Sequence, residues 1–138
     1  TSLQLVAQQQ KTNLNKDQVA VEGYDVVAYF TENKAVKGNP TYQVKDHGAT
    51  YYFSSQKNKE TFKKNSSQYK PQYGGWCAYA IGKSGEYVEV DPKTFKIINN
   101  KLYLFYNKYL TNTLKLWNKE EATLLPNADK NWQTLSKK

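Results

Sequence analysis

The sequence predicts an α+β fold, a single domain in which small antiparallel β-hairpins pack with short helices. Short apolar runs alternate with turn residues through the first three quarters of the chain, which is typical of hairpins. A helical period replaces this alternation in the last quarter. The length of 138 residues fits one domain, and the aromatic share of 14% predicts a core built largely from rings.

The chain begins with segments that lead into the domain. Residues 1–16 have an apolar start followed by polar glutamine, lysine and asparagine, and they predict a loosely held arm or a short helix. Residues 19–21 predict a short strand. Residues 24–30 are apolar except for Asp25. An acid in such a run needs a partner, so Asp25 either caps the helical turn after it or faces a site, and the two roles are compatible.

A hairpin is predicted next. Residues 41–45 and 49–53 read as its two strands, and Asp46-His47-Gly48 reads as its turn. His47 is the only histidine of the chain. A histidine in such a turn is usually solvated, and it gains a role here only if the turn folds over Cys77.

Helical signals follow this hairpin. Ser54 or Ser55 is expected to cap a charged helix that runs to Lys64, with Phe62 as its apolar anchor. Residues 65–69 predict a second short turn that leads the chain to Pro71.

Extended segments are predicted again after residue 81. A flexible loop over residues 82–85 precedes a short strand or an extended piece over residues 87–90. Residues 95–98 and 101–106 form the clearest hairpin signal of the chain. Asn99-Asn100 between them suits a two-residue turn, because asparagine tolerates the left-handed conformation.

The period changes from Asn107 onward. A helical face is predicted from Leu110, Leu114, Trp117, Leu124 and Leu125. Pro126 is expected to break or restart this helix. A final short amphipathic helix is predicted from Ala128, Trp132 and Leu135.

The charge pattern limits the classes of partner. The net charge is +8, and lysine supplies all twenty cationic residues, since the sequence has no arginine. Arginine is the usual reader of guanine edges, so specific nucleic-acid binding is not expected. Dispersed lysine favours a solvated surface, with at most a peripheral association with anionic membranes. No apolar run reaches the length of a membrane span.

Two further absences bear on compartment and cysteine chemistry. The single cysteine excludes an internal disulfide within this sequence. The sequence has no methionine, not even at position 1. We therefore expect a mature form whose signal peptide or lipoprotein leader has been removed, located in the periplasm or another extracytoplasmic compartment.

Residues 69–81 concentrate the features that point to chemistry. They hold Pro71, the Gly74-Gly75 pair and the only cysteine, Cys77, which precedes a small apolar run able to open a helix. A thiol at a helix start is activated by the free N–H groups there. The alternative is that Cys77 is a small buried hydrophobe beside aromatic rings.

The single thiol supports two kinds of chemistry. Cys77 could act as a catalytic nucleophile that cycles through a sulfenic acid or a mixed disulfide with a small thiol or oxidant. It could instead ligate copper or zinc together with His47 and Asp25, since thiolate, imidazole and carboxylate suit these ions.

A pocket for a planar ligand is a further candidate. Its residues would come from the aromatic and glycine positions near Cys77 and from the first apolar run: Tyr24, Tyr73, Gly74, Gly75 and Trp76. The alternative is that these rings form the core of a small aromatic domain.

Four ordered motifs resemble the YHS domain family. They are the runs at residues 23–30, 48–55, 73–78 and 101–107. Within that family the chain is similar to the exported bacterial branch of YHS domain-containing (seleno)proteins. The resemblance spans roughly residues 19–132 and implies an arm over residues 1–18 followed by a YHS-like domain with C-terminal helices over residues 19–138.

The resemblance also bears on chemistry. Metal-binding YHS modules carry cysteines at the positions that Ser54 and Asn58 occupy here, so that metal site is absent from this sequence. Some members of the branch carry selenocysteine where Cys77 stands, which implies a redox, nucleophilic or metal-ligating role. The leading hypothesis is an exported binding module, rather than an enzyme, that holds copper or zinc at Cys77, His47 and Asp25. The alternatives are a redox enzyme with Cys77 as nucleophile and a structural domain that binds an unknown protein partner.

Overall fold

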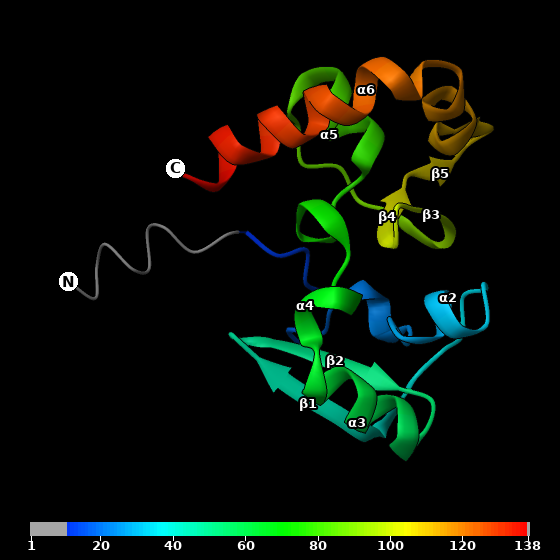
Figure 1. The fold of residues 1–138 in the computed structure, drawn as a ribbon, viewed down its shortest axis with the longest axis vertical. Coiled ribbons are helices and arrows are strands. Elements are labelled where there is room, and N and C mark those ends of the chain that lie inside the picture. Colours follow the sequence, from blue (N-terminus) through cyan, green and yellow to red (C-terminus); the bar gives the residue numbers. More distant parts are fainter. Residues whose placement is uncertain (1–10, 138) are drawn as a thin grey trace.

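The computed structural model describes residues 11–137, which form one α+β domain with two hydrophobic cores. The long axis of the molecule is vertical in Figure 1, where the first hairpin and its helices form the lower half and helices α5 (Ala78–Ser84) and α6 (Thr113–Ser136) lie in the upper half. The predicted fold class is therefore confirmed. Of the predicted arm, residues 1–10 lie outside the described residues.

The first core lies under the β1–β2 hairpin. Strand β1 (Asn39–Asp46) pairs antiparallel with β2 (Ala49–Phe53), and the turn residues His47 and Gly48 both have positive φ. The helices of this half are short: α2 (Ala28–Thr31), α3 (Gln56–Lys64) and α4 (Ser66–Tyr69). The hairpin thus forms as predicted, with a longer first strand.

Helix α3 is the main helix packed on that hairpin. Ser55 caps it by accepting a hydrogen bond from the Asn58 N–H at 3.1 Å. Phe62 is fully buried, and its ring centroid lies 4.8 Å from that of Tyr51 and 5.0 Å from that of Phe53. The predicted cap and anchor of this helix are confirmed.

The β3–β4 hairpin separates the two cores. Strand β3 (Asp91–Ile98) pairs with β4 (Lys101–Phe105), and the Asn99-Asn100 turn has the predicted left-handed conformation. Side chains alternate along β4 because successive residues of a strand point to opposite faces. Leu102 and Leu104 enter the first core, whereas Tyr103 and Phe105 enter the second.

The second core is closed by α5 (Ala78–Ser84) and α6 (Thr113–Ser136). Gly82 lets the two helices approach closely, because a Cβ atom there would lie 2.9 Å from the backbone oxygen of Leu124. Trp117 of α6 is fully buried, with its ring 5.4 Å from that of Phe105.

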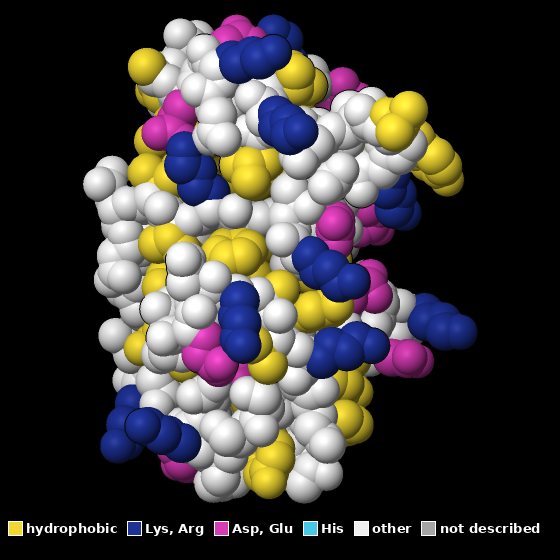
Figure 2. Space-filling model, turned by 90° about the vertical axis from the view of Figure 1, so that its right-hand side faces the viewer, with side chains coloured by type: hydrophobic (Ala, Val, Ile, Leu, Met, Phe, Trp, Pro, Cys, Tyr) yellow, Lys and Arg dark blue, Asp and Glu magenta, His cyan; other side chains and the backbone are white. Residues whose placement is uncertain are grey.

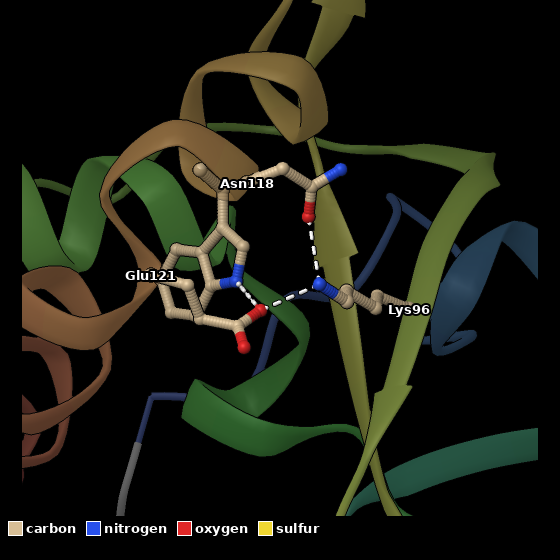
Figure 3. A network of polar contacts seen from close by, with 4 residues as sticks. Lys96, Asn118 and Glu121 are labelled. Carbon is tan, nitrogen blue, oxygen red and sulfur yellow. Dashed lines mark hydrogen bonds and ion pairs between the residues drawn. The ribbon is translucent and has the colours of Figure 1, made fainter.

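A polar network joins β3 to α6 (Figure 3). The Lys96 ammonium donates to Asn118 Oδ1 at 2.7 Å and to Glu121 Oε1 at 2.6 Å. The Trp117 indole N–H donates to the same Glu121 oxygen at 2.8 Å. The hydrogen bond from Lys96 lowers the pKa of Glu121, and burial opposes that effect only in part.

The strand predicted over residues 19–21 is wrong, and of the two alternatives predicted for residues 87–90 the structure does not show the paired strand. Residues 19–21 make only isolated bridges, Val19 to Thr50 and Ala20 to Leu14, and then enter the 3₁₀ turn η1 (Val21–Gly23). Residues 87–90 pass the start of α5 without strand pairing, because the one backbone bond there runs from the Cys77 N–H to the Val88 oxygen.

The start and the interior of the C-terminal helix also differ from expectation. Residues 107–112 form a small hairpin, β5 (Asn107–Lys108) and β6 (Thr111–Asn112), so Leu110 lies in its turn and not on a helix face. Helix α6 runs through Pro126 and is distorted at Glu120 instead. Pro126 is exposed, and packing on α5 holds α6 together across it.

Candidate functional site

Asp25 is fully buried and accepts hydrogen bonds from five donors. Its Oδ1 accepts from the backbone N–H groups of Val27 at 2.9 Å and Ala28 at 3.2 Å. Its Oδ2 accepts from Ser54 N–H at 2.8 Å, Ser54 Oγ–H at 2.7 Å and Asn58 Nδ2–H at 2.8 Å. The predicted cap is confirmed, and the carboxylate also ties the start of α2 to the end of β2 and to α3.

Cys77 immediately precedes α5, as the sequence predicted, and its side chain is fully buried. Its sulfur accepts the Tyr106 N–H at 3.3 Å and lies 3.4 Å from Thr113 Oγ1. The Thr113 hydroxyl donates its one proton to the Tyr106 oxygen at 2.6 Å. The thiol is therefore the donor to Thr113, and this arrangement suits a protonated Cys77.

His47 occupies the β1–β2 turn, where its side chain is 84% exposed and its Nδ1 pairs with the Asp46 carboxylate. Each of the three residues predicted to share a metal, Cys77, His47 and Asp25, has separate partners. Among residues 11–137, no group of three or more His, Cys, Asp or Glu side chains is placed to hold a metal ion. The structure does not bring the three together.

A cavity of about 590 Å³ lies between the two cores. Ala49 and Tyr51 of the first core line one side, Tyr73 and Trp132 of the second core line another, and Asn13 borders it from the N-terminal segment. Its volume lies within the range of small-molecule sites, which is roughly 300–1,000 Å³. We therefore take this cavity as the candidate binding site.

Charged groups gather on one side of the cavity. Lys70 Nζ lies 2.8 Å from Asp46 Oδ2, and the other oxygen of Asp46 meets His47. Burial alone would raise the pKa of Asp46, but the hydrogen bond and charge of Lys70, followed by those of His47, lower it overall. Burial and the charge of Asp46 raise the pKa of Tyr51 to about 12. The cavity therefore presents a carboxylate, an ammonium and a neutral phenol.

The 3₁₀ turn η2 (Gln72–Gly75), which we call the glycine turn, forms another wall of the cavity. Tyr73, Gly74 and Gly75 have φ values of 57°, 61° and 84°, the left-handed region for which glycine is the default residue. A Cβ atom on Gly74 would lie 2.5 Å from the Lys11 oxygen. The Asn13 N–H donates to the Gly74 oxygen at 2.8 Å, so the turn holds the N-terminal segment against the cavity.

The predicted ligand-pocket residues are divided by the structure. Tyr73 and Gly74 line the cavity, whereas Tyr24, Gly75 and Trp76 are not among its lining residues. Tyr24 packs on the first core, Gly75 faces Pro71, and the Trp76 ring lies 5.2 Å from that of Tyr87.

Sequence reasoning missed most of the residues that line this cavity, among them Lys70, Asp46 and Trp132. Lys70 and Asp46 adjoin the motif residues Pro71 and His47, so their position beside those motifs could have found them. Trp132 carries no comparable signal, because only the folding of α6 over the glycine turn brings it there.

Comparison with known proteins gives one match. Residues 27–73 match the family model of the YHS domain, which confirms the resemblance over that segment and suggests a metal-binding, copper-associated module. The match begins just after Asp25 and ends at Tyr73, at the start of the glycine turn. No match was found among curated proteins or among solved structures.

Proposed function

We propose, from the YHS-domain sequence over residues 27–73, that the chain is a binding module whose ligand is a small organic anion with a planar body. The observation that carries this proposal is the cavity of about 590 Å³ between the two cores. Asp46, Tyr51, Lys70 and Tyr73 lie both in its lining and within the matched segment. The cavity would thus be a property of the YHS segment, completed by α6.

Lys70 is the group of the cavity lining that would bind an anion. The Lys70 side chain is 30% exposed, and an ammonium has three donors, so a ligand carboxylate can bind without displacing Asp46. The net charge of +8 adds a favourable long-range field. Tyr51, Tyr73 and Trp132 supply rings for the planar part. An aromatic carboxylate combines these features.

Benzoate and its neutral analogue benzamide test this proposal. In a titration followed by amide chemical shifts, we expect benzoate to perturb Lys70, Tyr73 and Gly74 and to bind more tightly than benzamide. Lys70→Gln should weaken benzoate binding about 10-fold, which is the loss of roughly 1.4 kcal/mol. Equal benzoate affinity in the variant and the wild type would refute the assignment.

Lys83→Gln is the matched control for that experiment. Lys83 lies in α5, is exposed and faces Glu120 at 3.8 Å, away from the cavity lining. Lys83→Gln removes one positive charge, as Lys70→Gln does, but outside the cavity, so it should leave benzoate binding unchanged. A loss as large as that of Lys70→Gln would mean that benzoate senses only the net charge of the chain.

The metal site suggested by the family does not fit the donors of this chain. The two oxygens of Asp25 already accept five hydrogen bonds, and the Cys77 sulfur faces an amide and a hydroxyl. Ser54 and Asn58, at the positions where the resemblance expects cysteines, donate to Asp25. We therefore do not route the proposed function through copper or zinc.

Cys77 is expected to be chemically protected, which tests the alternative of a thiol enzyme. In the native protein its reaction with Ellman's reagent should be at least ~100-fold slower than in urea, because reagent access requires opening of the fold. Cys77→Ser/Ser84→Cys is the control, since Ser84 is exposed and a thiol there should react at once. Rapid native reaction of Cys77 would restore the nucleophile hypothesis.

A further inference from the structure

The β5–β6 hairpin ends in a turn that is unusual in two respects. Tyr109 and Leu110, which we call the hairpin tip, have relative exposures of 88% and 108%. They are the exposed large hydrophobic residues of the described chain. Both also have positive φ, 52° and 68°, a conformation that bulky side chains rarely adopt.

The other hairpins of the described chain show what this turn would normally contain. His47-Gly48 and Asn99-Asn100 occupy the corresponding positions in β1–β2 and β3–β4, again with positive φ. Two-residue turns of this kind favour asparagine and glycine, because these residues tolerate the left-handed region. Tyrosine and leucine are costly there in both conformation and exposure, so folding alone does not account for them.

The base of this hairpin is firmly anchored. The Asn107 amide donates to Thr94 Oγ1 at 3.0 Å, and the Thr113 N–H donates to the Tyr106 oxygen at 3.0 Å. Asn112 caps α6 by accepting the Leu114 N–H at 3.0 Å. The hairpin tip therefore projects from a fixed support, at the edge of the upper half of the molecule in Figure 1.

The stretch of sequence that contains the hairpin tip carries charge of one sign. From Pro92 to Lys119 the sequence has no aspartate or glutamate. The lysines of that stretch are Lys93, Lys96, Lys101, Lys108, Lys115 and Lys119. Lys108 and Lys115 are both exposed and flank the hairpin tip in sequence. Figure 2 shows lysine side chains spread over one face of the molecule with acidic side chains among them, and hydrophobic side chains project from the right-hand edge of its upper half.

We propose that the hairpin tip inserts into the interface of an anionic membrane. Leucine favours the acyl region, tyrosine favours the headgroup boundary, and nearby lysines attract anionic lipid. A projecting tip suits a lipid surface, which needs no complementary pocket, better than a protein partner. No helix in residues 11–137 is long and apolar enough to span a bilayer. This inference does not depend on the cavity.

Co-sedimentation with vesicles tests the inference. The full chain should pellet with vesicles of 70% phosphatidylcholine and 30% phosphatidylglycerol, stay in solution with phosphatidylcholine alone, and lose binding as salt screens the lysines. Tyr109→Asn/Leu110→Gly should lower partitioning at least ~10-fold. The same variant should melt at a higher temperature than the wild type, because its residues suit the turn.

A control variant that keeps the hairpin tip apolar accompanies the co-sedimentation experiment. Tyr109→Phe/Leu110→Met keeps the hairpin tip apolar, so it should retain most of the binding. Equal pelleting of the Asn-Gly variant and the wild type would overturn the proposal, since binding would then depend on lysines alone. A wild-type chain that remains in solution with anionic vesicles would also overturn it, and would point to a protein partner.

Discussion

Asp25→Ala is expected to lower the free energy of unfolding by about 3–5 kcal/mol, which is a large part of the stability of a domain this size. The substitution leaves five donors without their acceptor, including the buried N–H groups of Val27 and Ala28. An unsatisfied buried donor costs more than the bond contributes when made. Urea unfolding followed by circular dichroism measures the loss.

The isosteric change separates charge from shape. Asp25→Asn keeps one oxygen for the backbone donors of α2, but its amide N–H₂ would oppose the Ser54 N–H, which cannot rotate away. We expect Asp25→Asn to lower the free energy of unfolding by about 1.5–3 kcal/mol, which places this variant between the wild type and Asp25→Ala. Asp17→Ala, at an exposed position, should change little. If Asp25→Ala is as mild as Asp17→Ala, Asp25 does not organise the first core.

The sequence predicted the elements whose signals are local. The caps of Asp25 and Ser55 follow from side chains that bond their own neighbouring backbone. The Asn99-Asn100 turn follows from the tolerance of asparagine for positive φ. The β5–β6 hairpin was missed for the same reason, since Tyr109-Leu110 has none of the residues that its backbone conformation favours. The prediction at Pro126 was wrong because packing of α6 on α5 outweighs the local preference of proline for ending a helix.

The candidate site depended on distant contacts and was predicted less well. Spacing alone could not show that Cys77 faces Tyr106 and Thr113, which lie 29 and 36 residues further along the chain. The cavity likewise joins the N-terminal segment to Trp132 across nearly the whole sequence. Motif reasoning found Tyr73 and Gly74 because the glycine pair marks an unusual backbone, and it missed the charges beside them.

Trp117→Ala is expected to destabilise the whole domain by about 3–5 kcal/mol, and not only its upper half. Trp117 is fully buried against Phe105, and its indole also binds Glu121 in the network that reaches Lys96. Strand β4 places alternate side chains in the two cores. Weaker packing of its side chains in the second core should therefore also disturb the packing of Leu102 and Leu104 in the first core.

Hydrogen exchange distinguishes one cooperative unit from two. The Val27 and Ser54 amides bond Asp25 in the first core. If β4 couples the cores, Trp117→Ala should speed hydrogen exchange at these two amides by the factor that corresponds to its loss of unfolding free energy. Leu116→Ala removes a half-buried neighbour that belongs to neither core and should have a much smaller effect. Unchanged protection at Val27 and Ser54, with rapid exchange confined to α6, would show that the first core stands alone. The YHS segment would then fold without the C-terminal helices, and Trp132 would complete the cavity without supporting the YHS segment.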